Sequence, residues 1–253
     1  MNIELHHYRD SILSNPTLGV HDESLLIARH GRLSCYYGPF EHTNLNAKVV
    51  LVGITPGAQQ AKNALTALRH SLHTGASDAD ALATAKRTAS FSGNMRGNLV
   101  ALLDSVGLDR ALGLESCARL FDDRVDLVHF TSVLRNPVFL DGADYSGNPT
   151  IASSAFLQTL SERWFGTEIE ALPNALWVPL GKEPTALLRE HVQRGRLRAE
   201  RVLDGLPHPS GANAERIAYF LGRKPRHLLS AKTRPEALDA GRELAMLRVA
   251  GWV

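Results

Sequence analysis

The chain of 253 residues has little cysteine, few aromatic residues and no long apolar run. Its two cysteines, Cys35 and Cys117, have no CxxC partner, which excludes a disulfide framework and a zinc or iron–sulfur site held by four thiolates. No stretch approaches the roughly 20 apolar residues that a bilayer span needs, and the opening MNIELHHYRD lacks the basic start and apolar centre of a secretion signal. These absences predict a soluble, cytoplasmic protein.

Motifs for phosphate, dinucleotide and metal binding are missing as well. The sequence has no GxxxxGK[ST] phosphate loop, and no GxGxxG follows an expected strand. Its 11 histidines occur without HExxH or HxH spacing. We therefore expect neither a cofactor nor a metal.

The composition is that of a folded chain with a large core. Hydrophobic residues make up 44% of it and charged residues 21%, which excludes disordered and collagen-like chains. No linker rich in Pro, Gly and Ser divides it. We expect a single domain over residues 1–253, with residues 1–47 as a helical N-terminal extension packed on it. In that extension ESLLIARHG ends on Gly31, which suits the C′ position of a helix.

Positive charge is concentrated toward the C-terminus. The net charge is only +2, but residues 189–234 contain eleven Lys or Arg against four Asp or Glu. Of the 28 basic residues 22 are Arg, whose planar guanidinium suits phosphate. Such a block faces a polyanion or forms a solvated surface, and charge alone leaves both interpretations open.

Apolar strands alternate with helical patterns along the chain. The clearest strand, 48–54 (KVVLVGI), is a continuous apolar run rich in β-branched residues. Further strands are expected at 125–131, 175–180 and 200–206, and helices at 59–72, 98–107, 153–164, 184–192 and 235–249. The alternation predicts an α/β fold, a three-layer α/β/α sandwich with a central, mostly parallel four-stranded sheet.

Gly, Pro, Ser and Asn gather in the segment after each expected strand. In an open parallel sheet, ligands bind at the carboxyl ends of the strands, where loop amides and helix N-termini converge. The four segments are GITPGAQQ (53–60), TSVLRNP (131–137), GKEP (181–184) and PHPSGAN (207–213). Ordinary turns use the same residue types, but the last segment adds His208, whose imidazole suits acid–base chemistry or hydrogen bonding.

Together with FSGNMRGNLVALLDSVGL (91–108) and VPLG (178–181), these segments resemble the uracil-DNA glycosylase superfamily, in the same order and over about residues 48–221. The resemblance implies an enzyme that flips a nucleotide out of DNA and hydrolyses the bond between base and deoxyribose. The chain is similar to divergent members without the four-cysteine iron–sulfur cluster, and to anti-phage glycosylases that act on modified cytosine.

The resemblance assigns His208 to donate a hydrogen bond toward a pyrimidine O2 as negative charge develops there. Ser210 would contact a DNA phosphate, and Gly211, Ala212 and Asn213 form the loop that enters the minor groove. The remaining expected DNA contacts are Arg216, Gly181, Lys182 and Arg96. Two structural alternatives stay open, in which His208 braces its loop and Asn213 caps the helix that begins at AERIAYFLG.

The residues expected at the base are Gly53, Ile54, Gly57, Phe91, Ser132 and Asn136. Phe91 matches the aromatic residue that stacks on the flipped base, and the alternative is a core phenylalanine. The insert at 74–90 places Lys86 and Arg87 shortly before Phe91, where they could touch phosphate.

Three positions depart from the family pattern. Thr55, the second expected catalytic residue beside His208, stands where several branches carry the Asp or Asn that orients or activates the water. A Thr hydroxyl can position a water, but it is a poor general base. Ser132 stands where members commonly carry an Asn that reads the pyrimidine edge, for which Asn136 is a possible substitute. Gly57 stands where the strictest uracil enzymes carry a bulky aromatic that excludes a substituent on C5.

These departures favour a 5-substituted pyrimidine over plain uracil. We expect a monofunctional DNA N-glycosylase, a hydrolase that leaves an abasic site, acting on a modified base such as glucosylated hydroxymethylcytosine in phage DNA. The alternatives are a repair glycosylase for uracil or another deaminated base, a non-catalytic or adduct-forming DNA-binding protein on the same fold, and an enzyme of free nucleosides or nucleotides. DNA is the expected partner of a monomer that is associated with the nucleoid and not with a membrane.

Overall fold

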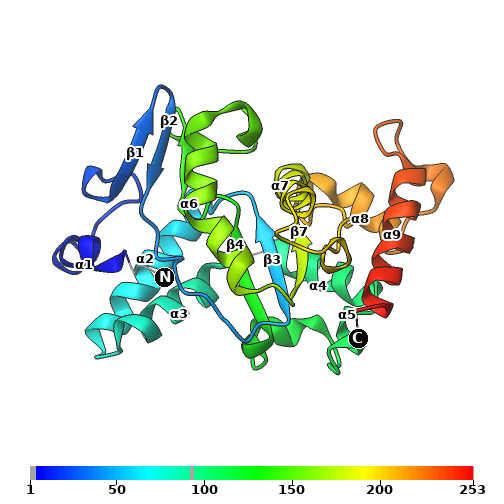
Figure 1. Cartoon of the computed structure of the whole chain (residues 1–253), viewed down its shortest axis with the longest axis horizontal. Coiled ribbons are helices and arrows are strands. Elements are labelled where there is room, and N and C mark those ends of the chain that lie inside the picture. The colour runs from blue at the N-terminus through cyan, green and yellow to red at the C-terminus, as the bar shows by residue number, and fades with distance from the viewer. Residues whose placement is uncertain (1–3, 92–93, 253) are drawn as a thin grey trace. The chain divides into compact units, whose positions relative to one another are not determined.

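The computed structural model describes residues 4–91 and 94–252 and confirms the α/β class (Figure 1). The helices in these ranges are α1 (Leu5–Ser14), α2 (Ala58–His73), α3 (Asp78–Ala89), α4 (Asn94–Ser105), α5 (Leu108–Ala111), α6 (Ala155–Ala171), α7 (Lys182–Gln193), α8 (Ala214–Phe220) and α9 (Pro235–Ala250). The strands are β1 (Leu26–His30), β2 (Leu33–Tyr36), β3 (Val49–Gly53), β4 (Val128–Ser132), β5 (Val138–Leu140), β6 (Ala143–Asp144) and β7 (Leu176–Pro179).

The chain divides into two compact units. Unit 1 consists of Met1–Leu45, Gly53–Ser90 and Phe130–Leu172, and unit 2 of Asn46–Val52, Phe91–His129 and Pro173–Val253. Each unit is therefore assembled from segments that are far apart in the sequence. The single domain over residues 1–253 stays a prediction.

The core of unit 1 forms on the packed pair α2 and α3. Apolar residues recur along α2 at intervals of three and four, which places them on one helix face. The buried ones are Ala61, Ala64, Leu65, Leu68 and Leu72. Helix α3 begins after Ser77, whose hydroxyl accepts a hydrogen bond from the backbone N–H of Asp80 at 3.2 Å. The two faces join one hydrophobic cluster with α1 and with aromatic residues of the N-terminal segment.

Only part of the N-terminal extension is helical, so the expectation for residues 1–47 is wrong in its second half. The helix expected to end at Gly31 is a β1–β2 hairpin, and Gly31 lies in its turn with φ +56°. Strand β2 also pairs with β5, with Cys35 opposite Val138. This partner is distant in sequence and supplies hydrogen bonds that the local pattern does not reveal, so tertiary pairing overrides the helical period.

Unit 2 contains the parallel pair of β3 and β7, with Val49 opposite Leu176 and Val52 opposite Pro179. The four valine and leucine residues of β3 are fully buried, as expected for a strand covered on both faces. The sheet to which they belong has the order β4–β3–β7. The other sheet, in unit 1, is antiparallel with the order β1–β2–β5–β6.

The prediction of a fourth parallel strand at 200–206 is wrong. That strand is reduced to a bridge between Val202 and Trp177, beside a 2.8 Å hydrogen bond from Leu203 N–H to the Trp177 carbonyl. Gly205 then turns the chain away with φ +99°, and a Cβ placed on it would meet the Gly241 carbonyl oxygen of α9 at 2.6 Å. The strand therefore ends early because its backbone packs against a helix instead of continuing a ladder.

The remaining expected elements are confirmed with shifts at their ends. The strands at 48–54 and 175–180 are β3 and β7, and the segment 125–131 holds a 3₁₀ turn followed by β4. The expected helices correspond to α2, α4, α6, α7 and α9. Across residues 4–91 and 94–252, no helix combines the length and apolar character that crossing a bilayer requires.

Candidate functional site

The residues predicted from the sequence fall into two sets, one in each unit. Those in unit 1 are Gly53, Ile54, Thr55, Gly57, Ser132 and Asn136. Those in unit 2 are Phe91, Arg96, Gly181, Lys182, His208, Ser210, Gly211, Ala212, Asn213 and Arg216. Each unit brings members of its own set into contact through hydrogen bonds and close packing.

His208 is held by its own loop in unit 2. The backbone N–H of Ser210 donates a hydrogen bond to Nδ1 of His208 at 3.2 Å. Because Nδ1 accepts, the proton of the neutral imidazole belongs on Nε2, which makes Nε2–H a donor. Burial lowers the pKa of His208 below its ordinary value of 6.5, so the neutral ring is favoured. The geometry thus provides a neutral hydrogen-bond donor rather than a cation.

Two further residues of unit 2 fix this loop. Asn98 in α4 donates from Nδ2 to the carbonyl of Pro209 at 2.9 Å. Gly181 has φ +108°, and a Cβ on it would lie 3.2 Å from Cδ2 of His208. Only glycine satisfies both conditions, so the sequence VPLG supplies the wall against which the imidazole packs. Lys182 follows as the first residue of α7, with an exposed side chain.

The rest of the loop is exposed or partly exposed. Asn213 donates from Nδ2 to the Ser210 hydroxyl at 3.3 Å and accepts from the guanidinium of Arg216 at 2.8 Å. Its side chain makes no capping hydrogen bond to α8, so that alternative for Asn213 is wrong. Gly211 and Ala212 are exposed at the tip. The His208 cluster, defined as His208, Ser210, Gly181 and Asn98, therefore carries a polar loop at the surface of unit 2.

Phe91 is buried, and Arg96 packs on an aromatic ring. The Phe91 side chain is only 8% exposed and its backbone is left-handed, with φ +49°. That burial is typical of a core residue, and stacking on a base stays a prediction. Arg96 lies over the ring of Phe121, with its guanidinium carbon 4.8 Å from the centroid. Ser92 and Gly93 of the same motif lie outside the described residues.

In unit 1 the Thr55 hydroxyl both donates and accepts a hydrogen bond. It donates to the carbonyl of Asn136 at 3.0 Å and accepts from the backbone N–H of Val138 at 3.1 Å. Its one proton is therefore used within the protein. Thr55 ties the loop after β3 to the segment before β5, which is a structural role and not that of a base.

Asn136, whose backbone carbonyl accepts the hydrogen bond from Thr55, has a buried side chain. It is 2% exposed, and its Oδ1 accepts from the backbone N–H of Gly38 at 3.0 Å. No described residue accepts a hydrogen bond from its Nδ2, which is also buried. A buried donor without a partner costs free energy, so it marks a position where polar recognition is possible. Ser132 ends β4 and is partly exposed.

The space beside Gly57 is occupied by Asp144, a residue that we did not expect at this site. Asp144 in β6 accepts a hydrogen bond at Oδ1 from the backbone N–H of Ala58, at 2.8 Å. Its Oδ2 lies 2.7 Å from where a Cβ of Gly57 would be. Gly57 therefore makes room for a carboxylate at the start of α2. The expectation that this glycine opens the base pocket at C5 is wrong for that reason.

A signal for Asp144 was present in the sequence. The segment VFLDGAD places Asp-Gly between two short extended runs, a pattern typical of a two-residue hairpin. Asp141 and Gly142 both have positive φ, +51° and +79°, as such a turn requires. This β5–β6 hairpin carries Asp144 back toward α2.

A buried charged cluster also lies in unit 1. Lys86, 4% exposed, donates from Nζ to the His42 carbonyl at 2.6 Å and lies 4.0 Å from a carboxylate oxygen of Glu168. Burial lowers the pKa of Lys86 to about 8. The expectation that Lys86 touches phosphate is therefore wrong, whereas Arg87 is exposed.

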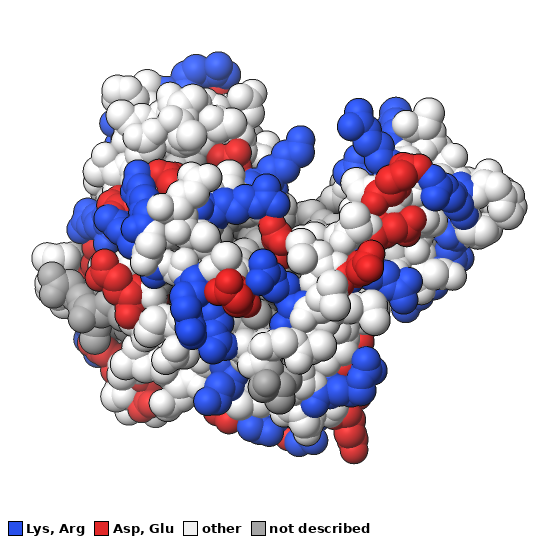
Figure 2. Space-filling view, turned by 45° about the vertical axis from the view of Figure 1, so that its right-hand side comes forward, with Lys and Arg blue, Asp and Glu red and all other residues white. Residues whose placement is uncertain are grey.

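Four of the eleven basic residues in the block at 189–234 form ion pairs with neighbouring acids. Figure 2 shows Lys and Arg side chains interspersed with Asp and Glu on the face it draws. Ion pairs join Arg189 to Asp204, Arg194 to Glu190, Lys224 to Glu215 and Arg226 to Glu236. Exposed cations that pair with no acid among the described residues are Arg198, Arg216, Arg223, Lys232 and Arg234. These five are the ones best able to attract a polyanion.

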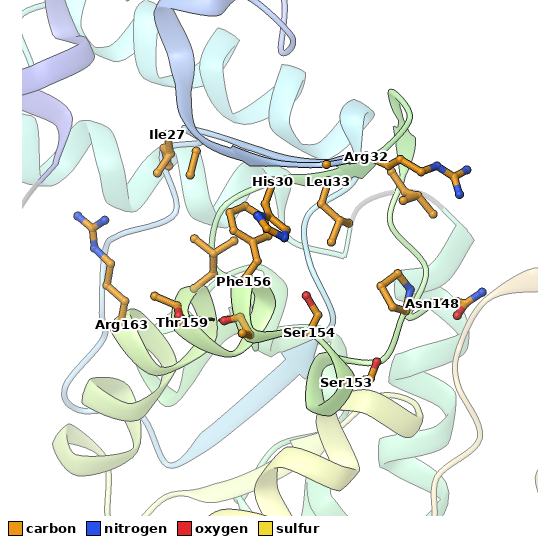
Figure 3. A pocket seen from close by; sticks show the side chains of 16 residues that line it. Ile27, His30, Arg32, Leu33, Asn148, Ser153, Ser154, Phe156, Thr159 and Arg163 are labelled. Carbon is orange, nitrogen blue, oxygen red and sulfur yellow. Dashed lines mark hydrogen bonds between the residues drawn. The ribbon is translucent and has the colours of Figure 1, made fainter.

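Unit 1 also has a cavity of about 1080 Å³ that the sequence did not predict (Figure 3). It lies between the β1–β2 hairpin and the start of α6, and the rings of His30 and Phe156 stack there with centroids 5.9 Å apart. Its arginines are already engaged, Arg32 by Asp141 and Arg163 by Glu4. The cavity is therefore aromatic and hydroxyl-lined rather than strongly positive. The hairpin that forms it was expected to be a helix, which is why it was missed.

In the described part of the chain, no group of three or more His, Cys, Asp or Glu residues is arranged to hold a metal ion. Both cysteines are buried thiols, and burial raises the pKa of Cys35 to about 12. Acid–base and hydrogen-bonding chemistry is what the His208 cluster and the Thr55–Asn136–Asp144 region of unit 1 offer.

Comparison with known proteins shows the family to which the chain belongs. No family model matches the chain, and no solved structure matches it. The chain is 37% identical over 199 residues to the uncharacterized protein YoxB of Bacillus subtilis (strain 168), covering 78% of each protein. At that identity and coverage, the chain belongs to the same protein family as YoxB.

Proposed function

We propose that this protein is a monofunctional DNA glycosylase of the uracil-DNA glycosylase type, which hydrolyses the N-glycosidic bond of a modified or damaged base. The observation that carries the proposal is the hydrogen bond from Ser210 N–H to Nδ1 of His208. It fixes a neutral imidazole with its donor on Nε2, within the motif HPSGAN. The proposed fold includes a three-layer α/β/α arrangement around a mostly parallel sheet.

The proposed reaction needs a donor at the base and a nucleophile at the sugar. The bond from C1′ to the base nitrogen breaks, and its electron pair leaves with the base. The Nε2–H of His208 stabilises the negative charge that develops on the base oxygen, because a fixed donor aimed at developing charge lowers the barrier. The oxygen of a water molecule then bonds to C1′, and this water releases one proton. The departing base anion takes up one proton, so the net reaction adds one water across the C1′–N bond. The product is an abasic site.

The proposed substrate is a 5-substituted pyrimidine, for which glucosylated hydroxymethylcytosine is an example. Support comes from Ser132, which cannot read a pyrimidine edge as an Asn amide does, and from the unpaired Nδ2 of Asn136. Gly57 gives no support for this substrate, because Asp144 fills the space beside it. Compared with the sequence alone, the structure therefore gives less reason to prefer a 5-substituted pyrimidine over uracil or another deaminated base as the substrate.

The proposed partner is DNA, bound by a monomer in the cytoplasm. Arg216 and the loop at Ser210–Asn213 lie next to His208 in the chain and are exposed or partly exposed. The exposed cations of unit 2 add sequence-independent attraction for phosphate.

The test is incubation of the purified protein with DNA containing uracil, hydroxymethyluracil, hypoxanthine, hydroxymethylcytosine or its glucosylated form. Mild alkali then cuts the strand wherever a base has been removed. We expect cleavage confined to a modified pyrimidine, absent in His208→Ala and retained in His227→Ala, which alters an exposed histidine of the same unit. Equal excision of every base, or activity that survives His208→Ala, would contradict the proposal.

A DNA-binding protein without turnover is the second candidate. The observation that favours it is the Thr55 hydroxyl, which donates its one proton to the Asn136 carbonyl and is a poor general base at the position where a water would be activated. Retained DNA binding with no alkali-labile product on any of the five bases would establish it.

A further inference from the structure

Helix α6 turns one face toward the cavity of unit 1. Four of its side chains line the cavity at positions i, i+3, i+4 and i+7, which is the spacing of a single helix face. They are Phe156, Thr159, Leu160 and Arg163. Leu160 is buried, whereas Phe156 is partly exposed and Thr159 is exposed. The first turns of α6 therefore present a surface that the protein itself does not fully cover.

An aromatic pair forms one wall of this cavity. The ring of His30, at the end of β1, lies nearly parallel to that of Phe156, with 24° between the planes and 5.9 Å between the centroids. Figure 3 shows both rings between the β1–β2 hairpin and α6. Aromatic rings attract other flat rings through offset stacking, which does not require a particular pattern of donors and acceptors. This wall is therefore suited to a flat ring of the ligand.

Uncharged polar groups line another part of the cavity, to the right of the rings in Figure 3. The Ser154 hydroxyl accepts from the backbone N–H of Leu157 at 3.4 Å, and it donates its own proton to no described residue. The Asn148 amide makes no hydrogen bond to a described residue. A hydroxyl and an amide offer both donors and acceptors, which is what the hydroxyl groups of a ligand require.

The two arginines at the cavity add no net charge to it. Arg163 pairs with Glu4 at 2.8 Å, and Arg32 pairs with Asp141. In Figure 3 both guanidinium groups lie at the edges of the cavity and point away from the aromatic rings. A phosphate or carboxylate would therefore gain little here, and the lining favours an uncharged ligand.

We propose that this cavity binds a nucleoside, an uncharged ligand in which a flat heteroaromatic ring is joined to a hydroxylated sugar. The ring stacks on the aromatic pair, and the sugar hydroxyls bond to Ser154 and Asn148. The volume of about 1080 Å³ is at the upper end of small-molecule sites, which span roughly 300–1,000 Å³. Every lining residue belongs to unit 1, so the site is complete within that unit and the inference does not depend on the glycosylase proposal.

The first measurement is calorimetric titration of the full-length protein with thymidine, deoxycytidine and deoxyadenosine. We expect each nucleoside to bind with a Kd below about 1 mM. The sugar 2-deoxyribose alone should not bind, because it has no ring to stack. Thymidine 5′-monophosphate should bind no more tightly than thymidine, because the arginines at the cavity are already paired.

Single substitutions test whether the aromatic pair holds the ligand. His30→Ala and Phe156→Leu each remove one ring, and each should weaken nucleoside binding by about tenfold or more. Phe156→Leu keeps an apolar side chain, so the melting temperature should stay close to that of the wild type. His30→Phe restores a ring and should restore the affinity. His73→Ala, which alters an exposed histidine of α2 in the same unit, is the matched control and should bind as the wild type does.

Titration of the His208→Ala protein separates this cavity from the proposed catalytic site. Binding that persists in His208→Ala and weakens in His30→Ala and Phe156→Leu would support the inference, whether or not the protein cleaves DNA. Three results would overturn it. They are the absence of saturable nucleoside binding to the folded wild type, equal affinities for the wild type, His30→Ala and Phe156→Leu, and much tighter binding of the monophosphate than of thymidine.

Discussion

The backbone N–H of Ser210 donates to Nδ1 of His208, and this single hydrogen bond determines which ring nitrogen carries the proton. With Nδ1 accepting, the proton of the neutral ring lies on Nε2. The loop therefore presents an Nε2–H hydrogen-bond donor in a fixed direction. Gly181, with no side chain to obstruct the ring, allows that orientation.

The first prediction concerns the protonation of His208. Burial lowers its pKa in the folded state, so the folded protein binds the proton less tightly than the unfolded chain. Its contribution to stability is present above pH of about 6.5 and is lost as the pH falls below that value. Nitrogen chemical shifts measured by NMR should show the Nε2–H tautomer and titration below 6.5. Titration above 6.5, or a proton on Nδ1, would contradict this account.

The second prediction concerns Thr55. Thr55→Val removes both hydrogen bonds and leaves the Val138 N–H and the Asn136 carbonyl without their partner. We expect a loss of about 1–3 kcal/mol in the free energy of unfolding, whereas Thr55→Ser, which keeps the hydroxyl, loses less. Chemical denaturation measures both. A Thr55→Val protein of wild-type stability would show that the hydrogen bonds of Thr55 to Asn136 and Val138 do not stabilise the fold.

The third prediction concerns Glu41, a buried carboxyl in unit 1. Burial raises its pKa to about 7 from 4.5, although the Leu5 N–H and Arg135 favour the charged form. The folded state therefore binds this proton more tightly, so the stabilisation is present below pH 4.5 and is lost as the pH rises through 7. Tyr37 and Glu4 also face the carboxyl.

Glu41→Gln removes this titration and keeps an oxygen for the Leu5 N–H. The difference in free energy of unfolding between the two proteins should change by an amount on the order of 2–3 kcal/mol between pH 4.5 and pH 7. The variant gains relative to the wild type as the pH rises. A difference that is flat across this range would mean that Glu41 titrates as an exposed carboxyl does.

The fourth prediction concerns the loop at 222–234. Glu215 in α8 accepts hydrogen bonds from Lys224, from Ser230 and from Thr233, which pins this loop to α8. The loop carries Arg223, an exposed cation without an acidic partner among the described residues.

Arg223→Ala should weaken DNA binding and reduce the slope of log affinity against log salt by about 1. Arg226→Ala is the matched control, since Glu236 already engages Arg226 and its removal should change the slope less. Fluorescence anisotropy at several salt concentrations measures both. Equal slopes for the wild type and Arg223→Ala would remove this loop from the DNA interface.

The sequence revealed elements whose signals are local. Strand β3 is a continuous β-branched run, and α9 begins with Pro235 at a position that proline favours, so both could be placed within a few residues. His208, Gly181 and Ser210 could be grouped because loops after parallel strands converge. Their hydrogen bonds could not be foreseen, since a tautomer depends on one backbone N–H.

The missed features depend on distant partners. The β1–β2 hairpin is completed by β5, and the expected fourth strand ends where Gly205 packs on Gly241. Asp144 is brought to Gly57 only because a two-residue turn folds β6 back on β5. Each of these is a long-range contact with no regular period in the sequence, although the Asp-Gly pair was a readable sign of the turn.

The central claim is that His208 takes part in removing a base from DNA. The most direct measurement is alkali-induced strand cleavage of DNA carrying a single modified pyrimidine, compared between the wild type, His208→Ala and His227→Ala. We expect a cut at the modified position with the wild type and with His227→Ala, and none with His208→Ala. Intact DNA in all three reactions, or equal cutting in all three, would contradict it.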